Sequence, residues 1–112
     1  MTLKTIVLAA VSILAFSAGA RADAIDGEWC NRDGKQMSIR GEQITTPDGN
    51  RTTGNYQRHN FSYVVPGTEP QAGATAQMSL INENTVHMRV AQAGTCQSRV
   101  PVQIWQRCTP VS

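Results

Sequence analysis

The feature that most constrains this chain is an alternation of apolar and polar side chains with a period of two. Met37 and Ile39 alternate with polar neighbours, and Phe61, Tyr63 and Val65 repeat the pattern further along. Successive side chains of a β-strand point to opposite faces, so a period of two buries one face and exposes the other. The alternation therefore predicts short strands that share a single core.

Turn residues divide this alternation at regular intervals. Gly, Pro, Asn and Asp gather at residues 31–34, 47–50 and 82–84, where they favour tight turns between strands. Short strands spaced about 8–12 residues apart are typical of sandwiches and barrels. We predict a single all-β domain over residues 23–112, folded as a small antiparallel up-and-down β-barrel or sandwich of about seven to eight short strands.

The segment before this domain has the pattern of a secretory signal peptide. Lys4 gives a positive start, residues 6–16 are mostly apolar, and Ala20-Arg21-Ala22 forms a small-residue cleavage site. The apolar run is shorter than the roughly 20 residues that span a bilayer. We predict a signal-peptide helix over residues 1–22, no transmembrane anchor after its cleavage, and a periplasmic or secreted product.

Loss of that segment leaves a domain whose charges balance. Lys4 and Arg21 depart with it, so eight basic residues face eight acidic ones. Nucleic-acid binding requires a basic run or patch, and the remaining cations are scattered along the chain. We therefore expect no nucleic-acid partner.

The tripeptide Gly27-Glu28-Trp29 resembles the first-strand Gly-x-Trp of the calycin superfamily, which includes lipocalins, avidins and their bacterial relatives. The resemblance implies a closed barrel in which a basic residue near the last strand packs over the tryptophan. Trp29 would be the ring and Arg107 the cation that closes the barrel, with Arg99 as the second choice. In its general plan the chain also resembles small periplasmic β-barrel inhibitors of proteases and lysozyme.

The predicted strands are too short to enclose a large ligand. A strand of about five to eight residues spans only about 17–26 Å, and side chains fill an eight-stranded barrel. We therefore expect the interior to be occupied by its own inward-facing residues, and binding to occur on the surface. The residues expected to face inward are Met37, Ile39, Tyr56, Phe61, Tyr63, Met78, Leu80, Met88 and Ile104.

Three cysteines allow one disulfide and one free thiol. With eight strands the first and last run antiparallel, which would bring Cys30 close to Cys96. With seven strands, or with a crossover, they run parallel and Cys30 can reach Cys108. We favour Cys30–Cys108 because it closes the longest loop, and Cys30–Cys96 is the alternative.

No residue pattern indicates catalysis, a cofactor or a metal. His87 and Met88 invite a copper hypothesis, but neighbouring strand residues face opposite sides and cannot share one ion. No Gly-x-Ser-x-Gly motif marks a nucleophile, and no acidic pattern marks a calcium loop. We predict that the protein is not an enzyme.

The function we predict is binding of a protein partner in the bacterial envelope, in the manner of an inhibitor. The contacts are expected on the loops at residues 32–34, 47–50 and 66–74, because loops carry function more often than strands. A small-ligand carrier of calycin type and a structural envelope protein are the alternatives. The sequence does not identify the partner or the oligomeric state.

Overall fold

The architecture is an antiparallel meander in which strands pair in chain order. The computed structural model describes residues 24–111, which form nine strands and a short 3₁₀ turn, η1 (Gln97–Arg99). These strands form one sheet in the order β4-β3-β2-β1-β9-β8-β7-β6-β5. Their bounds are β1 (Gly27–Cys30), β2 (Gln36–Arg40), β3 (Gln43–Thr45), β4 (Arg51–Thr53), β5 (Asn55–Gln57), β6 (Asn60–Val64), β7 (Thr75–Asn82), β8 (Thr85–Ala91) and β9 (Gln103–Arg107).

Gly54 turns this sheet into a nearly closed barrel. β4 and β5 lie at the two edges of the sheet, yet Gly54 alone separates them in sequence. They form one bent strand, whose first half pairs with β3 and whose second half pairs with β6. A Cβ at position 54 would collide with the Phe61 ring and the Ser62 carbonyl oxygen, so the bend requires glycine. The predicted up-and-down β-barrel is confirmed.

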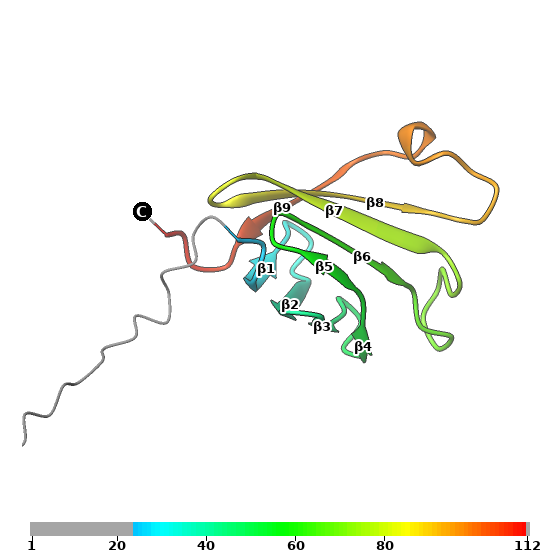
Figure 1. Cartoon of the computed structure of the whole chain (residues 1–112), viewed down its shortest axis with the longest axis horizontal. Coiled ribbons are helices and arrows are strands. Elements are labelled where there is room, and N and C mark those ends of the chain that lie inside the picture. Colours follow the sequence, from blue (N-terminus) through cyan, green and yellow to red (C-terminus); the bar gives the residue numbers. More distant parts are fainter. Residues whose placement is uncertain (1–23, 112) are drawn as a thin grey trace, which may run out of the picture.

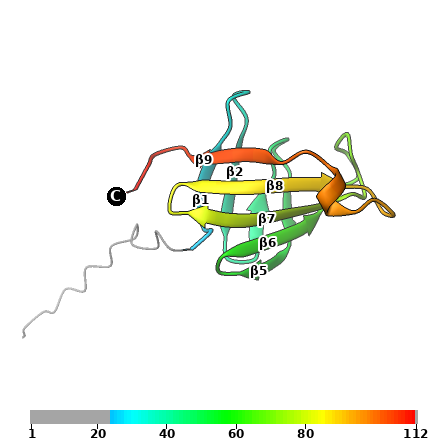
Figure 2. The ribbon, with the colours of Figure 1, turned by 90° about the horizontal axis from the view of Figure 1, so that it is seen from above.

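The two ends of the barrel differ in the length of their connections (Figure 1). Tight turns at 41–42, 58–59 and 83–84 lie at the end where residues 24–26 enter, which we call the sealed end. The longer connections 31–35, 46–50, 65–74 and 92–102 lie at the opposite end, which we call the open end. Figure 2 shows β5 to β9 side by side in chain order, with the loop after β8 projecting beyond the barrel.

The core lies inside the barrel and consists mainly of the residues that the alternation predicts. Met37, Ile39, Phe61, Met78 and Met88 are at most 2% exposed. Tyr56 and Leu80 are partly buried and pack against this cluster. The remaining buried members are Ile25, Trp29, Ile44, Tyr63, Val65, Ala74, Ala76, Val86 and Trp105.

The prediction was wrong about the inward face of the last strand. Ile104 is 52% exposed, whereas Trp105 is 1% exposed and Arg107 is 8% exposed. β9 has large apolar side chains on both faces, so its alternation does not say which face is inside. The register decides, because Arg107 pairs with the buried Trp29 and Trp105 shares the side of Arg107.

The predicted signal peptide, residues 1–22, lies outside the described residues. Between residues 24 and 111, no helix is long and apolar enough to cross a membrane.

Candidate functional site

Arg107 closes the sealed end of the barrel from the inside. Its guanidinium carbon lies 4.5 Å from the centroid of the Trp29 ring. The guanidinium also donates hydrogen bonds to the carbonyl oxygens of Ala24 and Asp26, at 2.9 and 2.8 Å, and to that of Glu83. A guanidinium over an indole face adds electrostatic attraction to the burial of both groups. This cation therefore joins the entering chain, the last strand and the β7–β8 turn.

Glycine at position 27 makes room for that cation. Gly27 has a φ of +135°, which L-residues with a side chain rarely adopt. A Cβ there would lie 2.5 Å from the Arg107 Nη1. The Gly-x-Trp tripeptide thus supplies both the ring beneath the guanidinium and the space beside it.

Two opposing effects act on the charge of Arg107. Burial lowers the pKa of its guanidinium, and the negative charges of Asp26 and Glu83 oppose that shift. Asp26 is held in place, since it accepts hydrogen bonds from the Tyr56 hydroxyl and from the Gly41 amide. The sealed end is therefore a connected polar network with the Arg107 cation at its centre.

A disulfide joins Cys30 to Cys108, with their Cα atoms 5.0 Å apart. The favoured pairing is present, but the argument from strand direction was wrong, because β1 and β9 are antiparallel. β1 has only four residues, and it pairs with β9 only through Trp29↔Arg107 and Cys30↔Gln106. Cys30 pairs with Gln106, two residues before Cys108, so this register brings the two cysteines close together.

The open end contains a cup of about 440 Å³. Its floor is made by Tyr63, Val65, Met88 and Trp105, which are at most 7% exposed. Its rim comes from the loops at 31–35, 46–50 and 65–74, so the three loops predicted to make contacts surround one cavity. The cup lies at the loop end of the barrel, beside the buried core.

Acidic side chains dominate the rim of the cup. Asp33, Asp48 and Glu69 line it, and Lys35 is the cation among its lining residues. The Lys35 ammonium lies 3.1 Å from the Asp48 carboxylate. Glu69 accepts hydrogen bonds from the Thr46 hydroxyl and the Asn50 amide, and no described cation forms an ion pair with it or with Asp33. The rim carries a net negative charge.

Tyr63 places a polar atom on the floor of this cup. The side chain is 5% exposed, and its hydroxyl forms no hydrogen bond with any residue from 24 to 111. Burial raises the pKa of this phenol well above its usual value of 10.0, and the charges of Glu69 and Asp48 raise it further. The hydroxyl therefore stays protonated near neutral pH, on a side chain that lines the cup.

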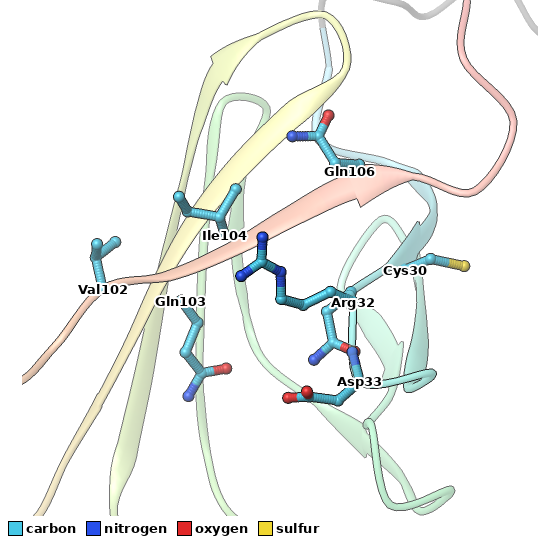
Figure 3. Close-up of a pocket in the computed structure, with 8 residues that line it drawn as sticks. Cys30, Arg32, Asp33, Val102, Gln103, Ile104 and Gln106 are labelled. Atoms are coloured by element: carbon cyan, nitrogen blue, oxygen red, sulfur yellow. The ribbon is translucent and has the colours of Figure 1, made fainter.

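A groove on the outer wall runs up to the cup. It has a volume of about 660 Å³ and lies between β9 and the loop after β1 (Figure 3). The short β1 leaves residues 103–105 of β9 without a strand partner on that side. Val102 and Ile104 are 36% and 52% exposed there, and Arg32 reaches toward β9 from the loop (Figure 3). Asn31, Asp33 and Gln103 line both hollows, so the groove and the cup adjoin.

The other candidate residues lie apart from the cup. Cys96 is a free, exposed thiol in the loop before η1. Among the residues that the structure describes, no three His, Cys, Asp or Glu side chains gather in a way that could hold a metal ion. The sequence reasoning missed Glu69 and Trp105 as cup residues. An acidic residue in each of the three loops was the available signal for a shared negative rim.

Comparisons with known protein families, curated proteins and solved structures find no match to this chain. The assignment of function therefore depends on the geometry of the two ends.

Proposed function

We propose that this chain is an exported, non-enzymatic binding protein that engages another protein at the open end of its barrel. The observation that carries the proposal is the convergence of three of the four longer loops around one cup, while the opposite end is sealed by Arg107. Loops held by a rigid scaffold are the usual place for recognition. An inhibitor-like role fits a site that projects from a stable barrel.

The groove beside the cup favours a protein partner over a small molecule. It exposes Val102 and Ile104 next to a stretch of β9 that lacks a neighbouring strand. An extended segment of a partner can add to such an edge through main-chain hydrogen bonds. Because the groove adjoins the cup, such a segment could also place a side chain in the cup.

Carriage of a small ligand is the second candidate. The cup volume of about 440 Å³ lies within the range of about 300–1,000 Å³ that small-molecule sites occupy. The Gly-x-Trp tripeptide with Arg107 over the ring also supports a calycin-like origin, and calycins include ligand carriers. The cup is open and its rim is polar, so we rank this function below protein binding.

Export to the periplasm or beyond is part of the proposal. The Cys30–Cys108 disulfide supports it, because disulfides form and persist in oxidising compartments. The leader pattern of residues 1–22 points the same way.

A capture experiment with two matched variants tests the proposed function. Ile104 in the groove and Ile81 near the sealed end are 52% and 51% exposed, so changing either to lysine removes a similar, partial burial. The purified protein, Ile104→Lys and Ile81→Lys would be used to capture partners from the envelope fraction of the source organism, followed by mass spectrometry.

We expect one partner to be recovered with the wild type and with Ile81→Lys, and lost with Ile104→Lys. Equal recovery with all three proteins would contradict binding at the open end. Native mass spectrometry of the same preparation would decide for the carrier if it showed a co-purifying small molecule and no protein partner.

A further inference from the structure

We propose that the cup at the open end accepts a cationic side chain of the protein partner, with arginine as the preferred residue. This inference rests on the proposed function and adds to it the chemistry of the residue that enters the cup. It is carried by the cavity, by the carboxylates on its rim and by the unpartnered Tyr63 hydroxyl on its floor.

The cup offers carboxylate acceptors that no cation among the described residues pairs with. Asp33 and Glu69 lack an ion-pair partner among the described residues, and the Tyr63 hydroxyl lacks a hydrogen-bond partner among them. A guanidinium carries five N–H donors and no acceptor, so it complements a site that presents carboxylates around a hydroxyl. An anionic group would be repelled by these carboxylates, and a neutral donor would form weaker hydrogen bonds with them than a cation does.

Charge and depth also favour a cation on a long side chain. Lys35 pairs with Asp48, which leaves the negative charges of Asp33 and Glu69 without compensation on the rim. The floor is apolar around Tyr63, through Val65, Met88 and Trp105. An arginine has a three-carbon stem that packs on apolar surface while its charged head meets the carboxylates. A hard metal ion needs oxygen ligands, and the side chains of the floor supply none besides the Tyr63 hydroxyl.

The probe for this test is N-acetyl-arginine amide, with N-acetyl-citrulline amide as its neutral counterpart of the same shape. The chain has two tryptophans, Trp105 in the cup and Trp29 at the sealed end. Their indole N–H signals in an NMR titration therefore report on the two ends at the same time. We expect the arginine amide to shift the Trp105 signal and to leave the Trp29 signal in place, and the citrulline amide to shift neither.

Charge-removing variants test which groups hold the cation. Glu69→Gln is expected to weaken binding of the arginine amide about tenfold, because it removes one charge-assisted hydrogen bond. Asp33→Asn is a second variant, whose side chain has no hydrogen bond within the described residues and so leaves the fold intact. Glu42→Gln, in the turn at 41–42 of the sealed end, is the matched control and is expected to bind as the wild type does.

The outcomes separate this inference from the proposed function. An equal response to both amides, or binding that both Glu69→Gln and Asp33→Asn leave unchanged, overturns the cationic cup. A captured partner that depends on Ile104 but not on Glu69 or Asp33 also overturns it, and leaves the proposed function standing. Binding of the arginine amide together with failure to capture a protein would retain the chemistry of the cup and reject the protein partner.

Discussion

The sealed end and the open end of the barrel use polar groups in opposite ways. At the sealed end, the Arg107 cation donates to three backbone carbonyls and lies over the Trp29 ring. At the open end, the Tyr63 hydroxyl has no described partner, and Asp33 and Glu69 have no described cation. A polar group that is satisfied within the fold contributes to its stability, whereas one that is left unsatisfied near solvent is available to a ligand.

This difference follows from the connections of the meander. At the sealed end, the entering segment 24–26 and the short turn at 83–84 bring carbonyl oxygens close enough together for one side chain to bond three of them. Longer loops at the open end hold their side chains apart around a cavity of about 440 Å³. The same strands therefore end in a closed network on one side and in a cup on the other.

The largest expected effect is loss of the disulfide beside the sealed end. Replacing both Cys30 and Cys108 by serine frees a loop with a sequence separation of 78. We expect the free energy of unfolding to fall by about 4 kcal/mol in urea denaturation. Cys96→Ser at the open end is the control and should change it by less than about 0.5 kcal/mol. Similar losses in both proteins would contradict the contrast between the ends.

Arg107→Met tests the network itself. The change removes the hydrogen bonds to three carbonyls and the contact with Trp29, so we expect a loss of about 3 kcal/mol. Arg40→Met is the matched control, because Arg40 is exposed and lies 4.0 Å from Glu28. Its effect should stay below about 0.5 kcal/mol. Urea denaturation of the two variants would refute the role of Arg107 if their midpoints moved equally.

The chain has two tyrosines, one at each end, and removal of their hydroxyls sharpens the comparison. Tyr56 donates to the Asp26 carboxylate, whereas the Tyr63 hydroxyl has no described partner. We expect Tyr56→Phe to cost about 1–2 kcal/mol of unfolding free energy at pH 7, and Tyr63→Phe less than about 0.5 kcal/mol. A larger loss of unfolding free energy in Tyr63→Phe than in Tyr56→Phe, measured by urea denaturation, would contradict this prediction. It would show that the Tyr63 hydroxyl stabilises the fold.

A smaller effect is expected from pH, because ionisation of Tyr63 at high pH lowers the free energy of unfolding. The pKa of Tyr63 is raised above its usual value of 10.0, so the unfolded chain releases this proton before the folded one does. The contribution of Tyr63 is fully present below pH 10 and decreases as the pH rises from there toward the folded pKa. We expect the free energy of unfolding to decline above about pH 10, and to decline less steeply in Tyr63→Phe. Equal slopes would place the Tyr63 hydroxyl in solvent.

Much of the fold was accessible from the sequence, because a buried face leaves a period of two in the side chains. The alternation predicted a barrel and most of the buried core residues, including Met37, Phe61 and Met78. It failed at β9, where Ile104 and Trp105 are both large and apolar, and only pairing with a distant strand decides which one is inside. The bend at Gly54 was also hidden, since a lone glycine in a strand does not reveal a barrel corner.

The cup was less accessible than the fold. Its three loops could be named from their turn residues, but their convergence on one cavity is a property of the closed barrel. Tyr63 looked like an ordinary core residue, because its burial follows the alternation and the lack of a partner for its hydroxyl does not. Glu69 lies in the 65–74 loop, where no alternation of apolar and polar residues predicts which way a side chain faces. Local sequence carries no record of which groups remain unsatisfied.

Amide hydrogen exchange, followed residue by residue by NMR, tests the contrast between the ends most directly. At the sealed end, the amides of Ile25, Arg107 and Cys108 donate to Arg58, Asn84 and Glu28. We predict that these three exchange only through global unfolding, and that the amides of Thr95 and Arg99 in the loop before β9 exchange far faster. Equal protection at both ends, or faster exchange at Ile25 and Cys108 than at Thr95, would contradict a barrel that is sealed at one end and open for binding at the other.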